Sequence, residues 1–266
     1  MKKFFHIVLF WGILFTAIPL FAHTPKVAGE GPLGLTVGLE YLGKHLHRGV
    51  YDYDKDGAFV PFISYNVLDT GLNVTFSAMI ADDYIFEGKK HNDAWRDLNI
   101  TNLGLDYEHN FGLVTLGAGV LYFGYWDNDL SYMESHISIA FDELFLSPTI
   151  IFTHDYHFHE KLWEDFYIQF GISHTFGLLE KASLTLGAIA GYFNFKSEDK
   201  SGISDIDLSA ELAVAAGAVT CFAGFHYVIV PSKDFWHHDD IYSLSHGREK
   251  KDISRFYSRF GVAYTF

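Results

Sequence analysis

Hydrophobic and polar residues alternate one by one along most of the chain, which is the pattern of β-strands with two different faces. A clear case is 254–266, where even positions from Phe256 onward are mostly apolar and odd positions are polar or small. Apolar residues occupy alternate positions in the same way in 33–41, 72–80, 114–122, 166–172 and 206–214. Between them lie mainly hydroxyl, amide and carboxylate side chains, and no segment has the pattern of a long amphipathic helix.

The alternating segments predict about twelve strands. Most are ten to fourteen residues long, which is longer than the usual strand of a soluble protein and suits a tilted crossing of a membrane. An even number is what a closed single-chain bacterial barrel needs. The predicted strands are 33–44, 58–67, 70–81, 97–109, 112–126, 132–142, 145–156, 164–176, 182–195, 203–216, 218–230 and 254–266.

The connections between these strands alternate in length. Short turns are predicted at 67–70, 110–111, 142–144, 177–181 and 216–218, whereas long or charged loops are predicted at 45–57, 82–96, 157–163, 196–202 and 231–253, with a short exception at 127–130. If both ends of the barrel chain face the periplasm, every short turn lies on the periplasmic side and the long loops lie outside. That asymmetry is typical of transmembrane barrels.

Alternation alone does not decide what the apolar face contacts, because a soluble β-sandwich would turn it toward a dry core. Aromatic residues make up 18% of the chain against only six prolines, which suits strands with aromatic girdles. We therefore predict an all-β fold, a closed antiparallel up-and-down transmembrane β-barrel of about 12 strands. A soluble periplasmic barrel remains the alternative.

The first residues predict export. Lys2 and Lys3 precede an apolar run that contains Pro19 and ends at the small residue Ala22, as in a cleaved secretory signal helix. We expect residues 1–22 to be the signal peptide and 23–266 a single barrel domain, with a retained membrane anchor as the alternative. No later segment approaches eighteen consecutive apolar residues, and the lone Cys221 has no partner for an internal disulfide.

Charge limits the possible partners. Loss of Lys2 and Lys3 with the leader changes the net charge from −14 to −16, which disfavours nucleic-acid binding. Parity along the strands places several charged residues on the face opposite the apolar one, where they would line a lumen: Glu40, Asp205, Asp207, Glu211, Arg255 and Arg259. Because the first and last strands of a barrel are neighbours, Glu40 and the two arginines either pair along the closing seam or tune selectivity. The excess of acids favours a weak preference for cations.

Histidine is the one unusual polar residue, and most of the histidines fall toward the predicted outer loops. Two runs mix histidines with acids, 154–160 and 237–240, and imidazole with carboxylate is a ligand set for zinc, copper or nickel. The weak metal candidates are His157, His159, His237 and His238. Solvated acidic loops explain the same residues more simply, and no motif such as HExxH is present.

Catalysis would need a serine beside a histidine base, as in an outer-membrane lipase or deacylase. Ser135-His136 and Ser173-His174 are adjacent in sequence, but neighbours on a strand point to opposite faces. There is also no Gly-x-Ser-x-Gly elbow. A lipid-modifying enzyme is therefore the least favoured reading, and we expect no catalytic residue and no cofactor.

Two regions resemble known outer-membrane proteins. The last six residues, with Gly261, Tyr264 and the terminal Phe266, resemble the C-terminal signal that the barrel-assembly machinery recognises. The first hairpin, from Tyr41 through Arg48-Gly49-Val50 to 56–61, together with 119–122, resembles the TorF-type porin family. This resemblance implies an outer-membrane porin barrel embedded in lipid, and it implies no particular solute.

These observations predict a porin-like passive channel of the cell outer membrane for small polar or charged solutes. No plug domain or energy-coupling box is recognisable, which disfavours active import. The alternative is a non-conducting surface barrel whose acidic, histidine-rich loops capture divalent metal or a partner.

Overall fold

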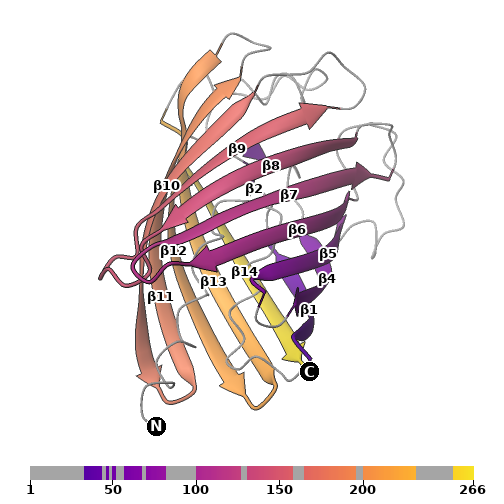
Figure 1. The fold of residues 1–266 in the computed structure, drawn as a ribbon, viewed down its shortest axis with the longest axis vertical. Coiled ribbons are helices and arrows are strands. Elements are labelled where there is room, and N and C mark those ends of the chain that lie inside the picture. Colours follow the sequence, from indigo (N-terminus) through magenta and orange to yellow (C-terminus); the bar gives the residue numbers. More distant parts are fainter. Residues whose placement is uncertain are drawn as a thin grey trace.

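The described residues form a closed barrel of twelve antiparallel strands in a computed structural model (Figure 1). The structure describes residues 33–43, 46–47, 50–51, 57–67, 70–81, 100–126, 131–157, 165–195, 200–231 and 254–266. The barrel strands are β1 (Leu35–Leu42), β4 (Ala58–Val67), β5 (Leu72–Ala81), β6 (Ile100–Asn110), β7 (Thr115–Tyr125), β8 (Ser131–Ala140), β9 (Thr149–His157), β10 (Phe166–Leu179), β11 (Ala182–Phe195), β12 (Lys200–Ala216), β13 (Val219–Ile229) and β14 (Ser254–Thr265). The short strands β2 (Leu46–His47) and β3 (Val50–Tyr51) pair separately.

The predicted fold class is confirmed, since each barrel strand lies within or close to one predicted segment. The predicted signal peptide, residues 1–22, lies outside the described residues. In the described ranges there is no helix that is long and apolar enough to cross a membrane.

The barrel closes between its first and last strands. β1 pairs with β14, where Glu40 is opposite Gly261, and on its other edge β1 pairs with β4. The seam continues to the chain end, because the Phe266 backbone N–H donates to the Leu35 carbonyl at 2.9 Å. Closure satisfies the backbone groups that would otherwise remain at two exposed sheet edges.

The short turns lie together at one end of the barrel, which we call the turn end, and the C-terminus lies there too (Figure 1). Gly217 has φ 65° between β12 and β13, and Gly112 has φ 92° after β6, both in the left-handed region that glycine adopts without strain. At the latter turn the Asn110 side chain accepts a hydrogen bond from the Gly112 N–H at 2.6 Å. The opposite end, which we call the loop end, carries the longer connections.

The largest error in a predicted strand start is at β9, while β1, β5 and β7 begin two or three residues later than predicted. We expected a strand from residue 145, but β9 begins at Thr149, because 141–148 forms a compact turn. In that turn the Phe141 N–H donates to the Pro148 carbonyl at 3.0 Å, and Ser147 has φ 37°. The apolar residues 144–146, which suggested a strand, instead lie exposed at the turn end.

The alternating apolar and polar residues of the strands form the two faces of the barrel wall. Large apolar side chains lie exposed on the outer face, for example Ile137, Phe170 and Leu208, whereas their polar neighbours lie buried on the inner face. Aromatic residues lie exposed near both ends of the outer face: Tyr65, Tyr107 and Tyr264 toward the turn end, and Tyr192, Tyr227 and Phe256 toward the loop end. Such an apolar band between aromatic girdles matches the surface that a bilayer requires.

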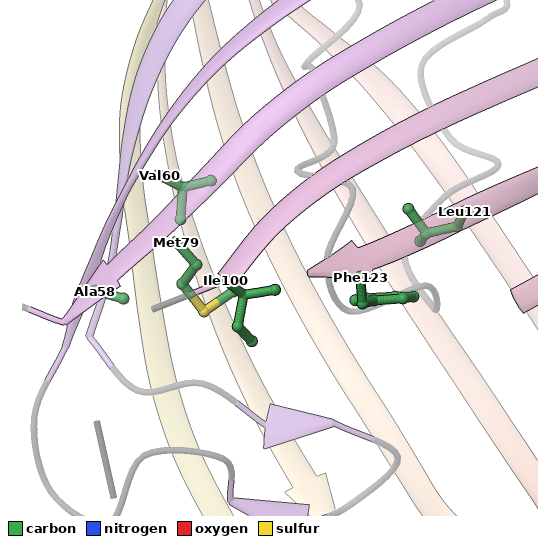
Figure 2. Packing of buried hydrophobic residues seen from close by; sticks show 6 residues of the cluster. All are labelled: Ala58, Val60, Met79, Ile100, Leu121 and Phe123. Carbon is green, nitrogen blue, oxygen red and sulfur yellow. The ribbon is translucent and has the colours of Figure 1, made fainter. Parts of the chain in front are cut away.

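Part of the inner face is apolar, which the sequence analysis did not predict. Ala58, Val60, Met79, Ile100, Leu121 and Phe123 form a buried cluster on β4 to β7 near the loop end (Figure 2). The Phe123 ring also stacks on Tyr132 of β8, with centroids 4.3 Å apart. These apolar side chains pack against one another and exclude water. Near the loop end, the inner wall is therefore polar around only part of its circumference.

Candidate pore lining

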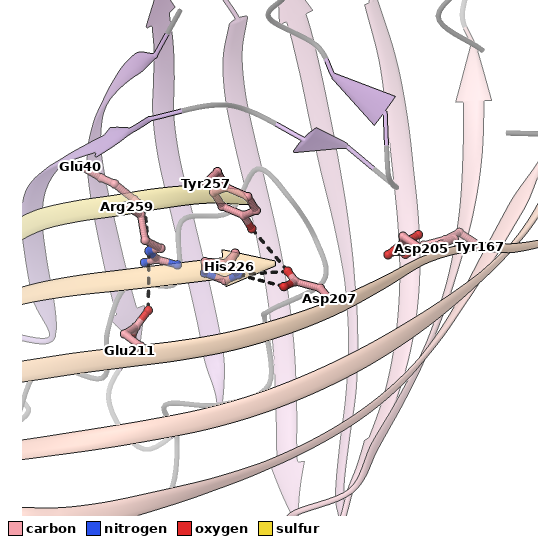
Figure 3. Close-up of polar contacts among 8 residues, drawn as sticks. All are labelled: Glu40, Tyr167, Asp205, Asp207, Glu211, His226, Tyr257 and Arg259. Carbon is pink, nitrogen blue, oxygen red and sulfur yellow. Dashed lines mark hydrogen bonds and ion pairs between the residues drawn. The ribbon is translucent and has the colours of Figure 1, made fainter. Parts of the chain in front are cut away.

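Charged side chains meet on the inner wall at the closing seam (Figure 3). Arg259 of β14 lies with its Nε 2.8 Å from Glu40 Oε1 of β1 and 3.6 Å from Glu211 Oε2 of β12. Glu40 is only 1% exposed, and the Arg259 guanidinium also lies 5.0 Å from the centroid of the Phe222 ring. The three charged groups therefore join β1, β14 and β12 across the seam from the inside.

A second cluster of polar side chains, from β12, β13 and β14, lies next to the charged cluster at the seam (Figure 3). His226 Nδ1 lies 3.0 Å from Asp207 Oδ2, and the imidazole stacks on Tyr257 with centroids 4.4 Å apart and planes 10° apart. The Tyr257 hydroxyl also donates to Asp207 at 3.4 Å. Because the carboxylate accepts both bonds, it holds the imidazole in one orientation.

Asp205 is positioned by an irregularity of β12. The pairing of β11 with β12 shifts at Gly191 and Tyr192, so that Ser204 and Asp205 are both buried while Ile203 faces outward. The hydroxyls of Tyr167 and Ser204 donate to Asp205, at 2.8 Å and 2.6 Å respectively. A β-bulge that re-aims a side chain in this way often marks a functional position.

A histidine and a carboxylate also pair on a different part of the wall. His136 Nε2 of β8 lies 3.1 Å from Asp106 Oδ1 of β6, and both side chains face inward. Further inward carboxylates on these strands and on β9 are Glu108, Glu134 and Asp155. Acidic groups therefore line more than one side of the barrel interior.

Several large inner side chains lie against the wall over glycines of the neighbouring strand. A Cβ atom added at Gly261 would collide with the Phe222 ring, one at Gly38 with the Phe62 ring, and one at Gly191 with the Tyr167 ring. Each ring thus occupies the space that a side chain of the neighbouring strand would fill. Rings that are stacked on the wall project less into the centre of the barrel.

Toward the turn end the inner face carries mainly hydroxyl and amide groups. The Thr36 and Thr265 hydroxyls lie 3.2 Å apart across the seam, and Ser64 donates to Asn73 at 2.9 Å. On β6 and β7, Asn110 donates to Thr115 at 3.1 Å. This region offers hydrogen-bonding groups to water and polar solutes, with fewer charges than the middle of the barrel.

The structure places five of the six predicted pore-lining residues on the inner face. Glu40, Asp205, Asp207, Glu211 and Arg259 point inward, and Glu40 and Arg259 form the seam pair that was one of the two predicted roles. The backbone of Arg255 lies in β14, opposite Val228, but its side chain is outside the described residues. A role of these residues in a pore remains a proposal.

The predicted metal ligands cannot be placed. His159, His237 and His238 lie outside the described residues, as does the side chain of His157 at the end of β9. Within the described ranges, no three histidine, cysteine or acidic residues gather closely enough to hold a metal ion. Metal capture by the outer loops therefore stays an untested prediction.

The adjacent serine–histidine pairs lie on opposite faces, as strand geometry requires. His136 faces inward, whereas the Ser135 hydroxyl donates to Tyr156 at 3.5 Å. Ser173 is buried on the inner face, whereas His174 Nδ1 lies 2.6 Å from the Phe145 carbonyl at the turn end. Neither sequence pair can act as nucleophile and base.

The predicted assembly signal forms the end of the closing strand. Gly261 lies in β14 under the Phe222 ring, and Tyr264 and Phe266 lie exposed with their ring centroids 4.6 Å apart. The two aromatic rings are therefore available on the outer face at the turn end. Recognition of this strand by the assembly machinery remains a prediction.

Sequence reasoning did not identify His136 and His226 as inner-wall residues. Parity was the available signal, because His226 shares its face of β13 with Thr220, Phe222 and Gly224. Their carboxylate partners could not be predicted, since the pairs depend on how β12 is aligned with β13 and on how β6, β7 and β8 are aligned.

Comparison with known proteins shows the fold. The barrel is similar to the solved KdgM porin in complex with disordered oligogalacturonate, with a TM-score of 0.55 and 12% identity over 87% of this chain and 99% of that chain. It is also similar to the NanC porin, with a TM-score of 0.52 and 12% identity over 87% and 100% of the two chains. No protein-family model and no curated protein sequence matches this chain. The chain therefore has the fold of outer-membrane β-barrels, and its resemblance to TorF-type porins stays a prediction.

Proposed function

We propose that the protein is a porin-like passive channel of the bacterial outer membrane, which carries small polar or charged solutes through its barrel and favours cations. The observation that carries this proposal is the division of the wall into an apolar outer face and an inner face lined by carboxylates, hydroxyls and amides. Such a division suits a barrel that has lipid outside and water inside. The fold shared with the KdgM and NanC porins supports the same conclusion.

The preference for cations follows from the charges of the lining. Among the inward side chains that the structure describes in the strands, carboxylates outnumber the one arginine, Arg259, which already contacts Glu40 and Glu211. A lumen with walls of low dielectric constant and excess negative charge raises the local concentration of cations. The KdgM porin was solved in complex with disordered oligogalacturonate, and we do not assign that solute to this chain.

The same proposal includes export, insertion into the outer membrane and transport without catalysis. Residues 1–22 would direct export and be removed, and β14 with its terminal Phe266 would be recognised by the barrel-assembly machinery. Transport through the barrel would be passive and would need no catalytic group or cofactor.

Planar-bilayer recordings of the refolded protein in a potassium chloride gradient test this function. We expect discrete open levels and a reversal potential on the side of cation preference, because the lining is acidic. Protein that inserts into the bilayer but does not conduct would favour the surface-binding barrel. A reversal potential that indicates anion preference would contradict the assigned selectivity. Liposome swelling with a panel of small solutes would then identify what passes.

A further inference from the structure

The outer wall carries a small group of polar side chains toward the loop end, which we call the outer polar patch: Ser135, His154 and Tyr156. Ser135 of β8 and His154 of β9 each stand between two buried inward residues, and Tyr156 has the parity of His154, so all three lie on the outer face. The next outward residues toward the middle of the wall, Ile137 and Phe152, are apolar and exposed. A polar group on a face that contacts lipid is costly unless it has a polar partner.

The three side chains of the outer polar patch lie close together. Ser135 is directly opposite His154 on the adjacent strand, which places their Cβ atoms about 5 Å apart. The Ser135 hydroxyl lies 3.5 Å from the Tyr156 hydroxyl, and the rings of His154 and Tyr156 have centroids 4.5 Å apart with planes tilted by 56°. The patch is therefore one compact group from two paired strands.

His154 presents a hydrogen-bond donor to the outside. Its Nδ1 is buried and makes no hydrogen bond within the described part of the chain. Buried N–H groups without an acceptor are rare, so Nδ1 carries the lone pair of the neutral ring and Nε2 carries the proton. Nε2 is not a buried atom, and its N–H can therefore donate to a molecule outside the barrel.

The Tyr156 hydroxyl is a second donor of this kind. It accepts the Ser135 hydroxyl proton, and no acceptor for its own proton is found among the described residues. A phenol hydroxyl can accept one hydrogen bond and donate another, so its donor remains available. The outer polar patch thus offers an imidazole N–H and a phenol O–H side by side, and it needs an acceptor.

The patch lies at the level of the aromatic girdle of the loop end. His154 is opposite Phe166 of β10, and the Phe166 ring stacks on Tyr192 with centroids 6.4 Å apart. β9 runs toward the loop end, so Tyr156 lies beyond His154 in that direction. Aromatic girdles mark the boundary between hydrocarbon and lipid headgroups. The two donors are therefore placed to meet headgroups.

We propose that Ser135, His154 and Tyr156 form a binding site for the phosphate group of a membrane lipid on the outer wall. The unesterified oxygens of a lipid phosphodiester are charged acceptors and carry no proton, which matches two donors that lack an acceptor. Hydrogen bonds to a charged acceptor are stronger than those to a neutral one, so the patch selects phosphate over uncharged headgroups. This inference goes beyond the proposed channel, since the site is outside the lumen.

Native mass spectrometry of the refolded mature protein, released from dodecyl maltoside micelles, measures this binding. We expect phosphatidylglycerol to bind more tightly than monogalactosyldiacylglycerol, which has a diacylglycerol part but no phosphate. Tyr156→Phe keeps the ring beside His154 and removes one donor. In this variant the dissociation constant for phosphatidylglycerol should rise about tenfold, as expected for one lost hydrogen bond to a charged group.

Tyr192→Phe is the matched control, because it removes the hydroxyl of another tyrosine of the same girdle. It should leave the dissociation constant for phosphatidylglycerol unchanged. An equal rise in both variants would show that the girdle binds lipid without a defined site, and an unchanged affinity in Tyr156→Phe would overturn the proposal. Lipid binding is measured without conduction, so a failure of this site is distinguishable from a failure of the proposed channel.

The side-chain ¹⁵N resonances of the histidines test the site without any substitution. In dodecyl maltoside micelles, the Nε2 resonance of His154 should shift on titration with short-chain phosphatidylglycerol. His174 is the internal control, because its Nδ1 already lies 2.6 Å from the Phe145 carbonyl, and its resonances should stay fixed. Equal shifts of both histidines would contradict a specific site. A shift of His154 with inorganic phosphate but not with the lipid would overturn the assignment to a lipid.

Discussion

Replacing Leu208 by arginine should lower the free energy of unfolding in lipid vesicles by about 2–4 kcal/mol, because a cation near the middle of a membrane strand on its lipid face must be desolvated. Leu208 lies midway along β12 and is 44% exposed on the outer face. Urea titration followed by the fluorescence of the protein's tryptophans measures the change.

Ser209→Arg is the control for this prediction, since the next residue of the same strand faces inward. There the arginine would lie between Asp207 and Glu211 on the inner face of β12, so we expect a loss of less than about 1 kcal/mol. Equal losses for the two variants, or a larger loss for Ser209→Arg, would be incompatible with lipid on the apolar side of the wall.

The second large effect is expected at the seam. Arg259→Met should cost about 3–5 kcal/mol, because it leaves the buried Glu40 without its contact at 2.8 Å and Glu211 without its nearby cation. Removal of one partner of a buried ion pair is costlier than removal of both. The same vesicle titration measures this loss.

A double variant tests the cause of that loss. Adding Glu40→Leu to Arg259→Met removes both buried charges, and we expect it to recover most of the stability through the coupling of the two sites. A single variant within about 1 kcal/mol of the natural protein would mean that the pair does not stabilise the seam. A double variant no better than the single one would contradict the same claim.

The sequence predicted most of the barrel because alternation and turn residues act locally. On β12, the apolar residues Ile206, Leu208 and Leu212 stand between inward polar ones, so the faces could be assigned without knowledge of the partners. The break at Ser204 could not be predicted, because a bulge depends on the partner strand β11. The turn at 141–148 was predicted too short, as 142–144, since its apolar residues also suit a strand.

The candidate site was predictable only in part for a similar reason. Parity assigned Glu40 and Arg259 to one face, and closure of the barrel makes their strands neighbours, so their pairing could be proposed. The partners of His226 and Tyr167 depend on exact register and on the bulge, which parity does not specify. The apolar patch around Phe123 was missed because a continuous run such as 120–123 gives no alternation to interpret.

The central claim is that the apolar face of the wall contacts lipid while the polar face contacts water. Labelling of single cysteines in proteoliposomes with a charged, membrane-impermeant thiol reagent tests it most directly, in a Cys221→Ala background that removes the exposed native cysteine. We expect rapid labelling of Ser209→Cys and none of its strand neighbour Leu208→Cys. Labelling of Leu208→Cys with protection of Ser209→Cys would contradict the account.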